Sequence, residues 1–273
     1  MTTSKQPEQQ PSGMDLWRSG KSPRPQGESK PSLWARLLRW VEPPPSSALS
    51  DSSSPFLFET DRVAGERYRT LSWKLNHLRQ KYNFQTVMVT SSVAGEGKST
   101  VALNLAAVLA ERSEHRVLLL DCDLRRPQVR TFLGGQAPGM KELLEGTAEL
   151  DDALHQEATL GFSYVPVVAP MEDPLKLLSN AQRLERVLNA ARHRFDFVIV
   201  DAPPVLPVSD PLFLAEAVDA IVFVVRAGDT SGRMLSRALS LLRRDKLLGL
   251  IFNGTARSLQ YEEYARRREA PPP

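Results

Sequence analysis

The sequence has one cysteine, no long apolar run and little excess charge, and each of these shortages excludes a class of protein. Cys122 has no second cysteine among the 273 residues, so the chain forms no internal disulfide and no metal site built from several cysteines. No run of about 18 apolar residues is present, and the polar N-terminal residues lack the apolar centre of a signal peptide. We therefore expect a cytoplasmic protein.

Charged residues make up 25% of the chain and carry both signs throughout, which gives a formal net charge of +3. This excess is small, and it is not gathered into a basic stripe of the kind that binds nucleic acid. The apolar content of 41% is ordinary for a soluble globular protein. The composition therefore predicts a folded soluble domain without a nucleic-acid partner.

Residues 1–55 differ in composition from the rest of the chain. Nine of the 21 prolines precede Phe56, among serine, glutamine and charged residues, and such a segment cannot bury enough apolar surface to offset its ordering entropy. We expect it to be largely disordered, apart from a short amphipathic helix over residues 32–41. One face of that helix carries Leu33, Trp34, Leu37, Leu38, Trp40 and Val41. This face fits a membrane surface, a partner protein or the chain's own domain equally well.

Residues 60–254 alternate short apolar runs with helical patterns. A helical stripe extends from Thr60 to about Tyr82. Six strand-like runs follow, at residues 84–91, 115–121, 162–168, 195–201, 219–225 and 247–253, with helical stretches such as 174–194 and 231–244 between them. Continuously apolar strands joined by crossover helices predict a parallel sheet covered on both faces. The predicted fold is a doubly wound, mostly parallel α/β domain over residues 60–254, followed by a flexible tail over residues 255–273.

The stretch TSSVAGEGKST, residues 90–100, has the order of strand, glycine-rich loop and helix that binds phosphate groups. Gly95 and Gly97 allow backbone conformations that turn N–H groups toward an anion, and the N-terminus of the next helix adds its dipole. Lys98 would neutralise the β- and γ-phosphates, and Ser99 would place its hydroxyl on Mg²⁺. The strict pattern requires glycine where this chain has Ser92, so the loop alone is a weak signal. The residues expected to contact a nucleotide here are Ala94, Gly95, Glu96, Gly97, Lys98, Ser99 and Thr100.

Carboxylates stand at the ends of two other predicted strands. Asp121 and Asp123 close one apolar run, and Asp201 closes another. In an open parallel sheet the ligand lies beyond the carboxyl ends of the strands, where the glycine-rich loop also falls. Aspartate after a strand is often a helix cap or a turn residue, but three carboxylates beside a phosphate loop favour a nucleotide site. Asn253 closes the last run, where it either reads the adenine edge or caps a turn.

The segments TSSVAGEGKST, LLLDCDLRRP, FVIVDAPPV and VDAIVFVVRAGDTS together resemble the bacterial tyrosine kinases of capsule and exopolysaccharide loci. These kinases are relatives of the MinD and ParA P-loop ATPases. The arrangement of Asp121, Asp123 and Arg125 as D-x-D-x-R is the most specific part of the resemblance, which covers residues 66–255. The chain looks like the cytoplasmic form of the family, in which a separate membrane-spanning polysaccharide co-polymerase is the activator.

The resemblance implies an ATP-dependent protein tyrosine autokinase that regulates the synthesis and export of capsule or exopolysaccharide. ATP and Mg²⁺ are then the cofactors, and Ser99, Asp121 and Asp201 hold the metal directly or through water. Lys98 and the three aspartates are the implied catalytic residues. By the same resemblance, Asp121 or Asp123 takes the proton of the acceptor hydroxyl.

The resemblance also implies partners and a place in the cell. The family phosphorylates tyrosines near its C-terminus, usually between subunits of a ring, and this chain offers Tyr261 and Tyr264. The ring contact motif of the family, E-x-x-R-x-x-R, appears here as Glu66, Arg69 and Ser72, so its third position departs from the pattern. We expect the activator to recruit the chain to the inner face of the plasma membrane, with the N-terminal amphipathic helix as a further peripheral contact.

Two other functions fit the same nucleotide site. A switch of the MinD or ParA type would hydrolyse ATP to reset a partner interaction, but those proteins carry a second lysine near the start of the loop, where this chain has Val93. An ATP-binding adaptor for polysaccharide export would bind nucleotide without transferring phosphate, since binding and chemistry are separable. Phosphotyrosine on the chain distinguishes the kinase from both.

Overall fold

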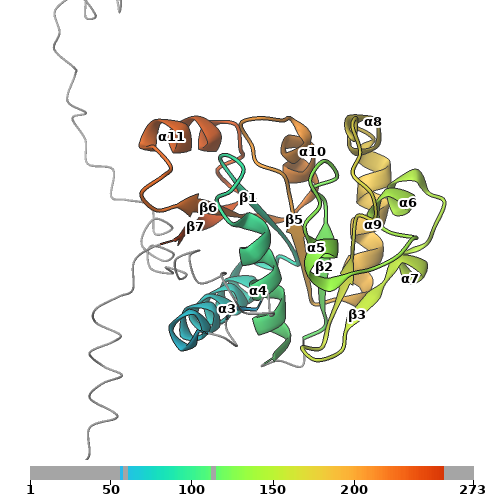
Figure 1. The fold of residues 1–273 in the computed structure, drawn as a ribbon, viewed down its shortest axis with the longest axis horizontal. Helices are drawn as coiled ribbons and strands as arrows, with labels where there is room; N and C mark the ends of the chain where they lie inside the picture. Colours follow the sequence, from blue (N-terminus) through green and yellow to red (C-terminus); the bar gives the residue numbers. More distant parts are fainter. Residues whose placement is uncertain (1–55, 58–60, 112–114, 255–273) are drawn as a thin grey trace, which may run out of the picture.

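A seven-stranded sheet lies between two layers of helices in the computed structural model, which describes residues 56–57, 61–111 and 115–254 (Figure 1). The strands are β1 (Thr86–Ser91), β2 (Val117–Asp121), β3 (His155–Glu157), β4 (Phe162–Val165), β5 (Phe197–Asp201), β6 (Ala220–Arg226) and β7 (Leu247–Asn253). The helices are α3 (Arg62–Tyr82), α4 (Lys98–Glu111), α5 (Val129–Leu133), α6 (Met140–Glu145), α7 (Leu150–Ala153), α8 (Leu175–Leu178), α9 (Ala181–Arg194), α10 (Asp210–Ala217) and α11 (Gly232–Ser240). The predicted N-terminal disorder, the predicted helix over residues 32–41 and the two tail tyrosines lie outside the described residues.

The strand order is β3-β4-β2-β5-β1-β6-β7, and every neighbouring pair is parallel except β3 with β4. The predicted doubly wound, mostly parallel sheet is therefore confirmed. Strand β3 was missed, because its residues His155, Gln156 and Glu157 are polar and carry no apolar pattern. It forms at the edge of the sheet by antiparallel pairing with β4, where polar side chains remain in contact with water.

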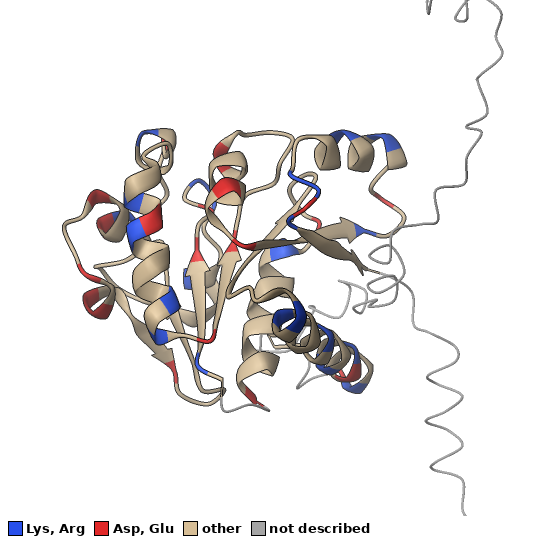
Figure 2. Cartoon of the chain, turned by 180° about the vertical axis from the view of Figure 1, so that it is seen from behind, with Lys and Arg blue, Asp and Glu red and all other residues tan. Residues whose placement is uncertain are grey.

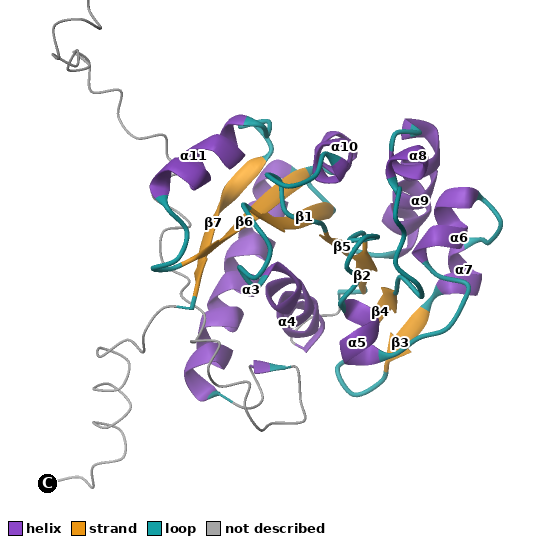
Figure 3. Cartoon of the chain, turned by 45° about the horizontal axis from the view of Figure 1, so that its top comes forward, coloured by secondary structure: helices purple, strands orange, loops and turns teal. Residues whose placement is uncertain are grey.

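Side chains alternate between the two faces of each strand, so each face of the sheet has its own core. Val87 and Val89 belong to the core that includes residues of α3 and α4, whereas Met88 between them belongs to the core that includes residues of α6, α9 and α10. Figure 3 shows these two groups of helices on opposite sides of the sheet. Helix α4 is buried along most of its length because it packs on the sheet and against α3. The central strands are therefore buried on both sides, and their ends are held rigidly.

Two helices differ from the lengths that the apolar periodicity predicts. The stretch 174–194 is divided into α8 and α9, because the Asn180 side chain accepts the backbone N–H of Arg183 at 3.2 Å and caps a new helix there. The stretch 231–244 is helical only to Ser240, after which hydrogen bonds of the tighter i→i−3 type end it. Among the described helices, none combines the length and the apolar character needed to cross a lipid bilayer.

Charged residues are spread over the outer helices, with many of the Lys and Arg along α3 and α11 and several Asp and Glu on α6 and α7 (Figure 2). In the six parallel strands the charged residues stand at the carboxyl ends, and they are Asp121, Asp201 and Arg226. Charges that close buried strands are costly unless they have partners or a ligand. This edge of the sheet is therefore the candidate position of a ligand-binding site.

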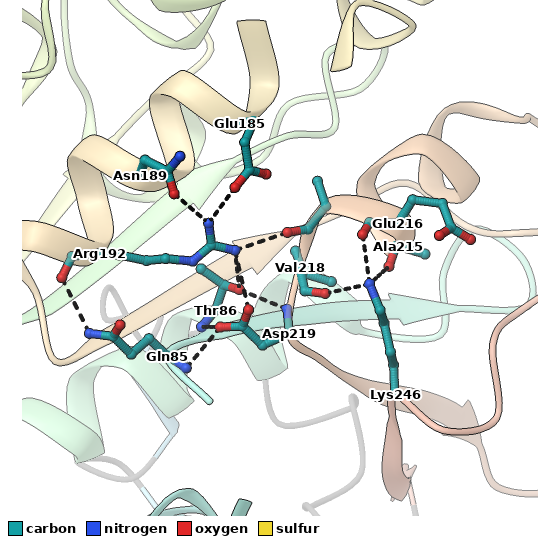
Figure 4. A network of polar contacts seen from close by, with 11 residues as sticks. Gln85, Thr86, Glu185, Asn189, Arg192, Ala215, Glu216, Val218, Asp219 and Lys246 are labelled. Atoms are coloured by element: carbon teal, nitrogen blue, oxygen red, sulfur yellow. Dashed lines mark hydrogen bonds and ion pairs between the residues drawn. The ribbon is translucent and has the colours of Figure 1, made fainter. Parts of the chain in front are cut away.

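At the amino ends of the strands a polar network joins β1, α9 and the turn before β6 (Figure 4). Asp219 accepts the backbone N–H groups of Gln85 at 2.9 Å and Thr86 at 2.8 Å, and Arg192 donates to it at 3.2 Å. Lys246 donates to three carbonyl groups at the end of α10, at distances of 2.6 to 3.0 Å. These contacts satisfy backbone groups that would otherwise be left unpaired at this edge.

Replacing Asp219 with asparagine should destabilise the domain by about 1–3 kcal/mol, because two backbone N–H groups lose a charged acceptor. Burial raises the pKa of this carboxyl, but the N–H groups of Thr86 and Gln85 and the charge of Arg192 outweigh burial and bring the pKa below its usual range. A lowered pKa stabilises the folded state above about pH 4, and this contribution is lost as the pH falls through the lowered pKa. In urea unfolding, Asp219→Asn should lower the free energy of unfolding by the full amount at neutral pH and by less in acid, relative to the wild-type chain.

An exposed ion pair serves as the control for this prediction. Asp173 lies 3.7 Å from Lys176, and both side chains are largely in solvent. Asp173→Asn should change the free energy of unfolding by less than about 0.5 kcal/mol. Equal losses in the two variants would contradict the role given to the network.

Candidate active site

The glycine-rich loop and the three predicted carboxylates lie together beyond the carboxyl ends of β1, β2 and β5. Strand β1 lies between β5 and β6, so the loop that follows it is adjacent to Asp201 at the end of β5. Asp121 is the direct neighbour of Asp201 in the pairing of β2 with β5. A pocket of about 640 Å³ opens here, lined by the loop, Asp123 and Asn253 among others. The residues assigned to a nucleotide site are thus brought together, while their individual roles stay predictions.

Two glycines give the loop its shape. Gly95 and Gly97 have φ angles of +88° and +90°, in the region that favours glycine. At Gly97 an added β-carbon would also lie 1.9 Å from the Nδ2 atom of Asn253, so only glycine fits without a shift of that side chain. The next residue, Lys98, begins α4, and the first N–H groups of a helix have no partner inside it. A glycine-rich loop that leads into a helix N-terminus is suited to phosphate oxygens.

Glu96 belongs to the loop, yet its carboxylate is engaged away from the pocket. Its Oε2 atom accepts the backbone N–H of Val93 at 2.9 Å, and its Oε1 atom accepts the hydroxyl of Thr230. The residue is 2% exposed. Thr230 lies in the turn after β6, where its hydroxyl oxygen also accepts the backbone N–H of Arg226 at 3.2 Å. The negative charge of Glu96 is thus held by partners of its own and ties the loop to the turn after β6.

Two further hydrogen bonds hold the backbone of the loop from β6 and β7. Arg226 donates to the carbonyl oxygen of Gly95 at 3.3 Å, and the Asn253 amide donates to the carbonyl oxygen of Glu96 at 2.9 Å. Asn253 was considered either as a reader of adenine or as a turn cap. In the structure it lines the pocket and supports the loop, and a contact with adenine stays a prediction.

The ammonium group of Lys98 lies among the carboxylates. Its Nζ atom is 2.8 Å from Oδ2 of Asp123 and 3.6 Å from Oδ1 of Asp201, and it donates to the hydroxyl of Ser99 at 3.2 Å. Burial lowers the pKa of Lys98, but the charges of Asp201 and Asp123 outweigh burial and raise the pKa. The lysine therefore stays protonated and places a positive charge where phosphate groups would lie.

The three aspartates are buried, and they differ in their hydrogen bonds. Asp121 accepts the backbone N–H groups of Asp123 at 3.2 Å and Val129 at 3.1 Å, and Asp123 accepts that of Arg126 at 3.1 Å. Both carboxylate oxygens of Asp201 are buried without a hydrogen-bond partner among the described residues. Burial and the charge of Asp201 raise the pKa of Asp121 well above its usual range. Burial also raises the pKa of Asp201, although the nearby ammonium group opposes the shift.

A magnesium ion fits this set of donors. The buried oxygens of Asp201 lack hydrogen bonds within the described chain, and the ammonium group of Lys98, 3.6 Å from Oδ1, is shared with Asp123. A further cation would offset the remaining cost of burying this carboxylate. Mg²⁺ is bound by one or two carboxylates together with water and substrate phosphates. Ser99, Asp121 and Asp201, the predicted metal residues, supply a hydroxyl and two carboxylates at the same edge of the sheet.

Arg125, the last residue of the D-x-D-x-R arrangement, is engaged away from the phosphate loop. It donates to the two carboxylate oxygens of Asp210 at 2.6 and 3.1 Å and to the carbonyl oxygen of Glu172 at 2.8 Å. Asp210 is 1% exposed and begins α10, so this pair fixes α10 beside the pocket. Sequence reasoning missed Thr230 and Arg226, although polar residues at or after the carboxyl end of a strand are the signal that would have identified them.

The chain is similar in sequence to a known protein family and to curated proteins. Residues 84–243 match the family described as AAA domain. Tyrosine-protein kinase YwqD of Bacillus subtilis (strain 168) is 32% identical over 209 residues, which cover 76% of this chain and 87% of that protein. Tyrosine-protein kinase etk of Escherichia coli (strain K12) is 30% identical over 194 residues, which cover 70% of this chain and 26% of that protein. The chain thus spans most of YwqD and about a quarter of the longer relative.

A solved structure shares the fold as well. The kinase domain of Escherichia coli tyrosine kinase ETK superimposes with a TM-score of 0.71 at 28% sequence identity. The match covers 80% of this chain and 92% of that domain. The similarity therefore extends over almost the whole of a kinase domain rather than over the phosphate loop alone.

Removing the Thr230 hydroxyl should weaken nucleotide binding about tenfold, because the buried carboxylate of Glu96 loses a donor that holds it in place. Thr230→Val keeps the shape of the side chain without the hydroxyl, and Thr230→Ser keeps the hydroxyl. Calorimetric titration of both purified variants with ATP and Mg²⁺ should show the loss only for valine. Equal affinities of the two variants would show that the bond to Glu96 does not support the loop.

Proposed function

The chain belongs to the bacterial tyrosine-protein kinases, and we propose that it transfers the γ-phosphate of ATP to tyrosines of its own tail to regulate capsule or exopolysaccharide synthesis and export. The observation that carries this proposal is the position of Lys98. Its ammonium group stands at the start of α4, after the glycine loop, and within 3.6 Å of Asp123 and Asp201. A phosphate loop, a lysine and carboxylates at one point are the parts that phosphoryl transfer needs.

The proposed substrate is ATP bound along the glycine-rich loop. The backbone N–H groups of residues 94–98 and the hydroxyl of Thr100 would hold the phosphates, and Lys98 would neutralise part of their charge. Ser99 and the buried pair Asp121 and Asp201 would hold a magnesium ion, which supplies charge neutralisation at the phosphate oxygens when bound. The pocket lining supports the phosphate contacts, because it includes Ala94, Gly95 and residues 97–100. Asp121 and Asp201 are buried behind this lining, and the metal assignment is supported by the oxygens of Asp201, which lack hydrogen bonds within the described chain.

Of the two aspartates considered as the base, we favour Asp123. It lines the pocket, whereas Asp121 is 0% exposed and uses both carboxylate oxygens to accept backbone N–H groups. In the proposed reaction the acceptor tyrosine oxygen forms a bond to the γ-phosphorus, the bond from that phosphorus to the bridging oxygen breaks, and ADP leaves. The hydroxyl proton passes to Asp123, which helps because a free tyrosine has a pKa of about 10.

The proposed partners are a membrane-spanning activator, which would recruit the chain to the inner face of the plasma membrane, and other copies of the chain. Arg69 pairs within the chain with Glu66 at 3.2 Å and Glu111 at 3.4 Å. Ser72, the departure from the ring contact motif, is 8% exposed on the buried side of α3. A contact between copies through this stretch would therefore rest on Glu66 and Arg69.

Phosphosite mapping of the protein from its native cells should find phosphate on Tyr261 or Tyr264. Lys98→Ala should lose this phosphate, because the phosphates of ATP lose their cationic partner. Asp123→Asn should still bind ATP but transfer phosphate about 10²–10⁴-fold more slowly, as expected for loss of a general base. Mass spectrometry of the three proteins side by side checks this. Unmodified tyrosines in a wild-type chain that binds ATP would favour the ATP-binding adaptor instead.

Deleting residues 1–55 should leave the affinity for ATP unchanged, because the proposed nucleotide contacts lie within residues 94–253. The deletion should weaken recruitment to the membrane. Titration with ATP and fractionation of cells that express the shortened chain measure the two effects. A loss of nucleotide affinity would show that the N-terminal segment belongs to the site.

A further inference from the structure

The lining of the pocket includes one cation to which the proposed phosphate site assigns no role. Arg126 lines the pocket with an exposed side chain, and within the described part of the chain its guanidinium group has no hydrogen bond or ion pair. The two other arginines of the lining are already engaged. Arg125 binds Asp210, and Arg226 binds Asp229 at 2.8 Å.

The backbone of Arg126 is held close to the proposed base. Its backbone N–H lies 3.1 Å from the Asp123 carboxylate and 3.2 Å from the Asp123 carbonyl oxygen. A turn of this kind holds the two α-carbons within about 7 Å of each other. Phe132, which is 38% exposed, and Gln128 line the same pocket. The pocket therefore presents an aromatic surface, a carboxylate and an uncommitted cation close together.

We propose that Arg126 selects acceptor peptides in which an acidic residue stands beside the tyrosine; this inference rests on the proposed kinase function. The tail of the chain has that chemistry, because Glu262 directly follows Tyr261 and Glu263 directly precedes Tyr264. Neighbouring α-carbons are about 3.8 Å apart. When the tyrosine hydroxyl is directed at the base, the neighbouring carboxylate lies within reach of a long guanidinium side chain.

The charge pair would act on binding and orientation of the acceptor. A guanidinium and a carboxylate can form two parallel hydrogen bonds, which fix direction as well as distance. Arg126 would thereby hold the peptide while the reacting atoms meet Asp123. It is a specificity-determining residue in this account, and it does not contact the transferred phosphate.

The test measures phosphate transfer to two synthetic peptides by the full chain carrying Tyr261→Phe and Tyr264→Phe, which removes its own tail acceptors. One peptide has the sequence of residues 258–265, and the other has glutamine in place of Glu262 and Glu263. Transfer from ATP and Mg²⁺ is followed over a range of peptide concentrations, and binding is followed by fluorescence anisotropy of labelled peptides. We expect the KM of the acidic peptide to be about threefold to tenfold lower.

Variants at Arg126 then assign the preference to this side chain. Arg126→Gln should raise the KM of the acidic peptide to that of the glutamine peptide, with no further effect on the glutamine peptide and no change in the KM for ATP. Arg126→Glu should instead favour a peptide with lysine at both acidic positions. Arg233 is an exposed arginine of α11 that does not line the pocket, so Arg233→Gln is the matched control and should keep the wild-type preference.

Three outcomes would overturn the proposal. The first is an equal KM for the two peptides when position 126 is arginine. The second is a preference for the acidic peptide that survives Arg126→Gln. The third is a change in the KM for ATP on Arg126→Gln without a change in the KM of either peptide, which would assign Arg126 to nucleotide binding. Absence of transfer to either peptide would show that the chain does not act as a kinase without its proposed activator, and the phosphosite mapping in native cells tests the kinase function separately. In that case the anisotropy comparison still decides whether Arg126 favours the acidic peptide.

Discussion

Three buried carboxylates and one ammonium group meet at the carboxyl edge of a sheet that is covered on both faces, and the rest of the site depends on the balance of these charges. Lys98 lies 2.8 Å from Asp123 and 3.6 Å from Asp201, which offsets only part of the negative charge. Burial raises the pKa values of Asp121 and Asp201 because little solvent reaches them. Such an edge favours a divalent cation, and the phosphates of a nucleotide would then balance the cation.

The phosphate loop is supported from strands far away in the sequence. Thr230 binds Glu96 across 134 residues, and Asn253 binds the loop backbone across 157 residues. Because Gly95 and Gly97 make the loop backbone permissive, its conformation has to be set by contacts from outside. The turn after β6 and the end of β7 supply these contacts, so both are tied to the loop by hydrogen bonds.

Two neighbouring arginines of the pocket differ in their contacts, one bound to a buried carboxylate and the other without a side-chain partner among the described residues. Arg125 is bound to the buried carboxylate of Asp210 and holds the start of α10. Arg126 lines the same pocket, and its guanidinium group remains available within the described structure. The two residues belong to one turn, in which Asp123 accepts the backbone N–H of Arg126. The pocket therefore has one arginine that supports the fold and a second that could meet an acceptor beside the proposed base.

The sequence by itself determined the parallel α/β fold, the glycine loop and the carboxylates at the strand ends, because periodicity and glycine conformation are local properties of the chain. Tertiary structure alone decided that β3 pairs with β4 and that the Arg125 guanidinium forms an ion pair with Asp210, 85 residues away. Such pairings depend on which elements the sheet brings together, and no local pattern reports the distance between side chains that are far apart in sequence. The choice of partner for each buried charge is therefore a property of the folded chain.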